Sequence, residues 1–172
     1  VELIKPIDEF LKHKAFMGFS RDLDVSTGLA FGAEQAFELI KELREIYDHQ
    51  IFAMPDGRLN LRPCTKYTTE YLSELGLKKK NVIQNIRGMA IYPYEYFGPL
   101  VFPDGKAKTT KNTYSIHHYA ATWSNAEEAR YAREADYWRA RFGMFGHKMV
   151  YLRRLLKKGD YKAWVERHFH NG

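Results

Sequence analysis

The sequence of 172 residues is poor in cysteine and has no long apolar run. Cys64 is its only cysteine, which excludes an internal disulfide and a zinc site made of several cysteines and fits a reducing compartment. No apolar stretch approaches the ~20 residues that span a bilayer, and the first residues lack the pattern of a secretory signal peptide. These absences predict a cytoplasmic protein.

The composition is that of a folded domain, and the sequence contains no low-complexity segment. Apolar residues make up 45% of the chain and aromatic residues 15%, which is enough for a domain with a real core. The chain begins at Val1 rather than at methionine, and Glu2–Pro6 looks like an internal segment of a longer sequence. We therefore expect the chain to be part of a longer protein, or to be processed before Val1.

Positive charge is concentrated at the C-terminal end. The formal net charge is +6, and residues 124–172 hold eleven Lys/Arg against six Asp/Glu, whereas the remaining residues hold sixteen against fifteen. Such asymmetry favours an anionic partner, either membrane lipid or nucleic acid, although a solvated helical face would also account for it. No recognised nucleic-acid-binding motif supports the second partner.

The spacing of apolar residues predicts an α/β fold in the first part of the chain. A short helix is expected over Ile7–Leu11 and a strand over Ala15–Phe19, followed by a polar loop to Ser26. Thr27–Phe31 is small and apolar and is expected to be buried. A helix is predicted over Ala33–His49, because apolar residues recur at helical spacing along one face.

Turn residues divide the next part of the chain. Thr65 is a candidate N-cap of a helix that runs to Leu75, and Gly76 is well placed to end it. Two strands are expected around Arg87-Gly88, over residues 82–86 and 89–92, and a third strand over residues 113–119.

The segment after residue 123 is predicted to be a helical, basic tail, so we expect two parts, residues 1–123 and residues 124–172. A helix is expected over residues 125–140. After Gly143 and Gly146, an apolar stripe is flanked by lysine and arginine; it consists of Phe145, Met149, Leu152 and Leu156. The stripe either docks on its own domain or lies on an anionic membrane.

Two adjacent histidines, His117 and His118, end the strand predicted over residues 113–119. Neighbouring side chains on a strand point to opposite faces, so only one of the two is expected to face a site. An imidazole at a strand end is a reasonable ligand for a divalent metal. The alternative is a pair of half-buried histidines with satisfied ring nitrogens.

Five segments in order resemble one enzyme family. They are ELIKPIDEFL (residues 2–11), AFMGF (15–19), STGLAFGAE (26–34), IYPYEYFGP (91–99) and NTYSIHHYAATW (112–123). Together they resemble the glycosyltransferase family with the sugar-binding "DXD" region, which includes capsular-polysaccharide glycosyltransferases and the yeast initiating mannosyltransferase. The resemblance covers residues 1–123 and implies the C-terminal, acceptor-side part of a nucleotide-sugar transferase of the GT-A fold.

The resemblance also implies a divalent metal, manganese or magnesium, held by an Asp-x-Asp that would lie immediately before Val1. Those carboxylates hold the cation that bridges the donor diphosphate. In this comparison His118 corresponds to a third metal ligand, and Trp123 shapes the nucleotide or diphosphate pocket or anchors the core. Asp22-Leu23-Asp24 is a literal Asp-x-Asp, but it follows the AFMGF strand in a polar loop and is not expected to be the metal site.

The remaining site residues that the resemblance implies bind the donor or the acceptor. Asp24 is expected near the sugar, and Thr65 precedes a helix where the family has a cleft loop, although capping alone would explain it. Ser26, Thr27 and Gly28 form a small polar run close to the donor sugar, or simply a tight strand entry. Tyr94 belongs to an aromatic loop that either stacks on an acceptor sugar or packs in the core.

The expected function is transfer of a hexose from a nucleotide sugar to a saccharide or lipid-linked acceptor, with retention as in the family. The catalytic acids would belong to the upstream half, so the chain alone is expected to be inactive. The C-terminal tail is expected to associate with the inner face of a bacterial membrane. The alternative function is a non-catalytic carbohydrate- or lipid-binding module.

Overall fold

The computed structural model describes residues 1–102, 106–118 and 125–158. The chain divides into two compact units. Unit 1 contains residues 1–99 and 109–117, and unit 2 contains residues 100–108 and 118–172. The predicted boundary at residues 123 and 124 lies outside the described residues.

Unit 1 is built on a four-stranded mixed sheet with the order β3-β2-β5-β4. Strand β2 (Ala15–Phe19) pairs in parallel with β5 (Met89–Tyr92) and antiparallel with β3 (Val25–Ala33), and β4 (Gln84–Ile86) pairs antiparallel with β5. Helices cover one face of the central strands β2 and β5 and aromatic rings cover the other, so every residue of both strands is buried. The mixed α/β class predicted from the sequence is confirmed.

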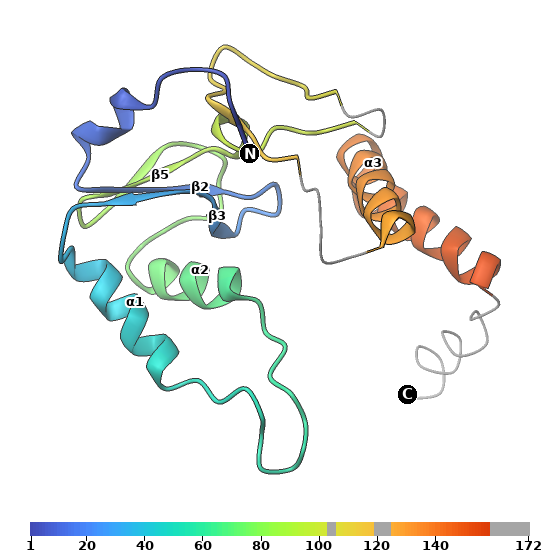
Figure 1. Ribbon diagram of the computed structural model, residues 1–172, viewed down its shortest axis with the longest axis horizontal. Helices are drawn as coiled ribbons and strands as arrows, with labels where there is room; N and C mark the ends of the chain where they lie inside the picture. Colours follow the sequence, from blue (N-terminus) through green and yellow to red (C-terminus); the bar gives the residue numbers. More distant parts are fainter. Residues whose placement is uncertain (103–105, 119–124, 159–172) are drawn as a thin grey trace. The chain divides into compact units, whose positions relative to one another are not determined.

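One face of this sheet packs against helices α1 (Glu38–Asp48) and α2 (Cys64–Glu74), which lie side by side below the strands in Figure 1. Alternate residues of β2 point to this face. The core here is formed by Ala15, Met17, Phe19, Val25, Leu39, Leu43, Leu72, Leu77, Ile86, Met89 and Ile91.

The opposite face of the sheet is covered by aromatic rings. Phe10, from the short 3-10 helix η1 (Asp8–Lys12), contacts the rings of Phe16 and Tyr92 at centroid distances of 5.2 and 4.9 Å. Further rings come from the 3-10 helix η2 (Tyr94–Tyr96) and the residues around it. The core-packing interpretation of this aromatic loop is therefore confirmed for Tyr92, Tyr96 and Phe97.

A separate two-stranded ladder joins the two ends of unit 1. Strand β1 (Glu2–Leu3) pairs antiparallel with β6 (Ser115–Ile116), so that Leu3 is opposite Ser115 and Glu2 is opposite Ile116. The backbone N–H of Ile4 extends the ladder by donating to the carbonyl of Tyr114 at 2.9 Å.

Several sequence predictions in unit 1 are confirmed and three are wrong. The strand Ala15–Phe19 has the predicted bounds, and Gly76 follows the end of α2 with a φ of +103°. The segment predicted as buried, Thr27–Phe31, lies on β3, an edge strand; Leu29 is buried there, but Thr27, Gly28 and Phe31 are exposed. An edge strand has a sheet partner on one side only, so fewer of its side chains are covered.

The predicted start of the first helix and the predicted cap of the second are wrong. Helix α1 begins at Glu38 rather than at Ala33, because Ala33 pairs with Ala15 in the sheet and Ala36 adopts a φ of +58°. Helix α2 has Pro63 at the N-cap position, and no side chain caps it. Thr65 is the second residue of this helix and does not cap it.

The described part of unit 2 is mainly a helical hairpin. Helix α3 (Ala126–Lys158) has a kink at Phe142 and Gly143, where the φ and ψ of Gly143 are 60° and −149°. The kink separates a first arm, residues 126–141, from a second arm, residues 144–158. Arg153 on the second arm pairs with Glu134 on the first at 3.5 Å, so the two arms run back along each other. Among the described residues, no helix combines the length and the apolar character needed to cross a bilayer.

Candidate functional site

The loops that follow the two parallel strands form the first candidate site. Because β2 and β5 run in parallel, their carboxyl ends lie at the same edge of the sheet. The loop from Ser20 to Asp24 follows β2, and η2 follows β5. Open α/β sheets bind ligands at such carboxyl-end edges.

Asp24 is the charged centre of this edge. Its side chain is only 8% exposed, and its carboxylate accepts hydrogen bonds from the ammonium groups of Lys66 at 2.7 Å and Lys79 at 3.0 Å. Lys66 lies in the first turn of α2, and Lys79 lies in the loop after this helix. The side chains of both lysines are about half exposed. The arrangement therefore presents two cations to solvent around one buried anion.

Burial by itself would raise the pKa of Asp24, since a charged carboxylate is poorly solvated in the interior. The hydrogen bonds and the positive charges of Lys66 and Lys79 outweigh this effect and lower the pKa below its ordinary value. Asp24 is therefore ionised at neutral pH.

Asn81 connects the loop after α2 to η2. Its side-chain oxygen accepts a hydrogen bond from the backbone N–H of Tyr94 at 3.0 Å, and its amide nitrogen donates to Glu95 at 2.9 Å. Tyr94 is half-buried and packs against the core. Asn81 thus holds η2 to the loop that carries Lys79. We call Asp24, Lys66 and Lys79 the Asp24 cluster.

The predicted run Ser26, Thr27 and Gly28 lies next to this cluster on β3. Gly18 on β2 is paired with Ser26, but the preceding residue, Met17, is paired with Phe31, so residues 27–30 bulge out of the ladder. Thr27 and Gly28 are exposed there, whereas Ser26 is half-buried. Bulges of this kind are common beside binding sites because they turn side chains and backbone away from the sheet.

The predicted residue Thr65 lies close to the same strand through its helix. Four residues further along α2, the hydroxyl of Thr69 accepts a hydrogen bond from the backbone N–H of Val25 at 2.8 Å and donates to the carbonyl of Thr65 at 2.6 Å. The structure thus places Asp24, the β3 bulge and the first turns of α2 together.

The two carboxylates of the Asp22-Leu23-Asp24 segment are placed differently. Asp22 is exposed, whereas Asp24 is buried and bound by two lysines.

The histidines follow directly after β6. His117 is half-buried and His118 is exposed, as expected for neighbours that point to opposite sides of an extended chain. Among the described residues, no group of three or more His, Cys, Asp or Glu side chains could hold a metal ion. The described residues therefore do not make up a metal site by themselves. Trp123 lies outside the described residues.

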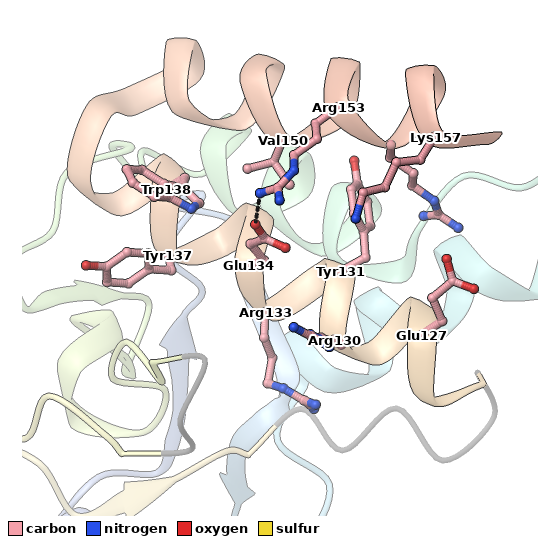
Figure 2. A pocket seen from close by; sticks show the side chains of 11 residues that line it. Glu127, Arg130, Tyr131, Arg133, Glu134, Tyr137, Trp138, Val150, Arg153 and Lys157 are labelled. Carbon is pink, nitrogen blue, oxygen red and sulfur yellow. Dashed lines mark hydrogen bonds and ion pairs between the residues drawn. The ribbon is translucent and has the colours of Figure 1, made fainter. Parts of the chain in front are cut away.

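The second candidate site is a groove between the two arms of α3. It has a volume of about 790 Å³ and is lined by five Lys/Arg side chains and two Glu side chains, so it is positively charged. Figure 2 shows Arg153 reaching from the second arm to Glu134, with Tyr131 between the arms. The guanidinium group of Arg154 lies 4.3 Å from the ring centre of Tyr131. Such a groove favours anions.

Sequence reasoning missed Lys66, Lys79 and Asn81. The run of three lysines over residues 78–80, followed by Asn81, was the available signal. It could not identify Lys79 as the partner of Asp24, because only the packing of α2 against β3 brings the two residues together.

Comparisons with known proteins give no match to this chain: no family model matches it, and neither a curated protein nor a solved structure is significantly similar.

Proposed function

We propose that this chain is the acceptor-side part of a nucleotide-sugar-dependent hexosyltransferase of the GT-A type, in the family with the DXD region that it resembles. In this proposal the parent protein transfers a hexose, with retention, to a saccharide or lipid-linked acceptor. The DXD half would lie upstream of Val1.

The observation that carries the proposal is the pairing of β1 with β6. The resemblance assigns metal ligands to two distant places, the residues directly before Val1 and His118. In the antiparallel ladder Glu2 is opposite Ile116, so a continued register would set Val1 opposite His117. A residue directly before Val1 would then neighbour His118. The ladder supports the proposal because it brings together two segments that the family needs side by side.

The Asp24 cluster is suited to a diphosphate leaving group. When the bond between the sugar carbon and the diphosphate oxygen breaks, negative charge develops on the diphosphate, and fixed positive groups stabilise it. An ammonium group has three N–H donors. Lys66 and Lys79 each use one on Asp24 and are about half exposed, so donors remain for a phosphate oxygen.

The β3 bulge and η2 would bind the sugars. The exposed hydroxyl of Thr27 can exchange hydrogen bonds with sugar hydroxyls, and the exposed Gly28 allows close approach of the backbone. The ring of Tyr94 can stack against the apolar face of a sugar. We assign Ser26 and Thr65 to the walls of the same site.

Manganese or magnesium belongs to this proposal only together with the upstream carboxylates. Because the described residues do not make up a metal site, no step of the reaction is assigned to a metal held by this chain. His118 is the residue that would complete the upstream Asp-x-Asp.

The test uses the longer natural protein that includes this chain and its upstream half. Purified protein is incubated with Mn²⁺, saccharide acceptors and a panel of nucleotide hexoses, and release of nucleoside diphosphate is measured. We expect turnover with at least one donor. Replacing Lys79 by Met should raise the KM for that donor or lower kcat by about tenfold, which corresponds to one lost charged hydrogen bond.

Lys80→Met is the matched control, because Lys80 is also an exposed lysine of the same loop, whereas the ammonium groups that bind Asp24 are those of Lys66 and Lys79. It should leave both kinetic constants unchanged. If the two substitutions have equal effects on the kinetic constants, the Asp24 cluster is not part of the donor site. Saccharide binding without turnover of any nucleotide sugar would favour the non-catalytic binding module.

A further inference from the structure

The kink of the α3 hairpin presents large apolar side chains to solvent. Phe142, Met144 and Phe145 surround Gly143 and are 51%, 55% and 70% exposed. Three large apolar side chains at one tip are unusual for a surface that meets only water, and such patches mark interaction sites.

The apolar surface continues along the second arm. Phe145, Met149, Leu152 and Leu156 recur at spacings of three and four residues, so they lie on one face of the helix. The last three are 49%, 45% and 60% exposed. Val150, by contrast, is buried at 6% exposure and lines the groove between the arms. The arm therefore packs through one face and leaves a second apolar face exposed.

The same part of the chain carries positive charge and no negative charge. Residues 137–158 contain seven Lys/Arg and no Asp/Glu. Two of the cations flank the apolar stripe. Lys148 is three residues from Phe145 and four from Leu152, and Arg153 is four from Met149 and three from Leu156. An apolar stripe with cations on both sides is the pattern of a helix that lies in a membrane interface.

We propose that the tip and the second arm of α3 bind the surface of a bilayer that contains anionic phospholipid. The side chains of Phe142, Met144 and Phe145 enter the boundary between head groups and acyl chains. The apolar stripe continues this contact, while lipid phosphates are met by Lys148 and by Arg153, whose side chain is 68% exposed although it also pairs with Glu134.

Charge favours this occupant over a second copy of the chain. A symmetric dimer through this face would oppose two surfaces that both lack carboxylates, and the cations would repel each other. An anionic membrane attracts each of them and also accommodates the apolar side chains. The proposal does not depend on the hexosyltransferase function.

The experiment measures sedimentation of the 172-residue chain with lipid vesicles. One set consists of phosphatidylcholine and phosphatidylglycerol in equal amounts, and the other of phosphatidylcholine alone. We expect binding to the anionic vesicles that weakens as salt is added, because salt screens the lipid charges, and at least about tenfold weaker binding to the neutral vesicles.

Two variants separate the apolar and the charged contributions. Phe145→Ser with Met149→Ser should weaken binding by at least about tenfold, since two exposed apolar side chains no longer enter the interface. Lys148→Gln with Arg153→Gln should weaken it roughly thirtyfold at low salt, at about a fivefold effect for each charge. The circular dichroism of each variant must match that of the unchanged chain.

The matched control is Phe52→Ser with Leu61→Ser, which removes two apolar side chains that are 64% and 75% exposed in unit 1. It should bind vesicles like the unchanged chain. The proposal is overturned if folded, unchanged protein does not sediment with anionic vesicles, or if control and hairpin variants lose binding equally. Concentration-dependent self-association that the Phe145 and Met149 substitutions abolish, without vesicle binding, would identify a second copy as the occupant instead.

Discussion

At the scale of single residues, Asp24 illustrates how neighbours decide what a carboxylate can do. In the sequence it is the second acid of an Asp-x-Asp, a pattern that can hold a metal. In the structure two lysine ammonium groups bind its oxygens, so its role is to hold these two cations in place. Its burial and both partners depend on residues distant in sequence, which explains why the pattern alone does not reveal this role.

The stability of the protein should depend on pH through Asp24. Its pKa in the folded protein is below the ordinary value of 3.8, so its ionised form stabilises the fold above that value. This contribution is lost as the pH falls through the folded pKa. Asp24→Asn should cost about 1–3 kcal/mol at neutral pH and reduce the further loss of stability in acid.

Urea unfolding at a series of pH values from neutral to acidic measures this effect. The control is Asp22→Asn, which removes an exposed carboxylate two residues away. It should change neither the free energy of unfolding at neutral pH nor the dependence of that free energy on pH by a comparable amount. If the free energy of unfolding depends on pH in the same way for the unchanged protein and Asp24→Asn, the interaction of Asp24 with Lys66 and Lys79 does not stabilise the fold.

At the scale of helices and strands, burial decides what the sequence predicts well. Strands β2 and β5 are apolar on both faces and bounded by turn residues, so they are predicted correctly. Strand β3 is not, because Thr27–Phe31 is small and apolar like a buried segment but lies on the sheet edge. The bulge there depends on its register with β2, and no local pattern encodes a register shift.

The Asp24 cluster could be predicted only in part for a similar reason. Its carboxylate, Asp24, comes from the family resemblance. The two lysines come from different elements, and they meet Asp24 only after α2 has packed on the sheet.

The α3 hairpin should depend on the small size of Gly146. A Cβ at this position would lie 2.2 Å from the backbone carbonyl oxygen of Trp138, which cannot move as a flexible side chain can. Gly146→Ala should therefore separate the arms next to the kink and cost about 2–4 kcal/mol, in the range of severe overpacking. Thermal unfolding followed by circular dichroism at the helical signal measures the loss.

Gly28→Ala is the control for this substitution, because the nearest heavy atom to its Cβ would be the Ser26 hydroxyl oxygen at an ordinary 3.8 Å. It should unfold almost like the unchanged protein. If Gly146→Ala unfolds at the same temperature as this control, the close contact between the arms is not needed for the hairpin.

At the scale of the whole molecule, the two units carry different proposed tasks. Unit 1 contains the mixed sheet, the Asp24 cluster and the β1–β6 ladder, which we connect with the donor and acceptor sugars. Unit 2 contains the basic hairpin, which we connect with an anionic membrane. The two proposed tasks together would suit a transferase that acts on a lipid-linked acceptor.

The central claim is that this chain is one part of a nucleotide-sugar transferase and needs the upstream half for chemistry. Its most direct test compares hexose transfer by the longer natural protein with transfer by the 172-residue chain alone, with Mn²⁺ and the same panel of nucleotide sugars and acceptors. The account predicts a glycosylated product and released nucleoside diphosphate from the longer protein, and neither from the chain alone. No product from the longer protein with any donor, or clear turnover by the chain alone, would contradict it.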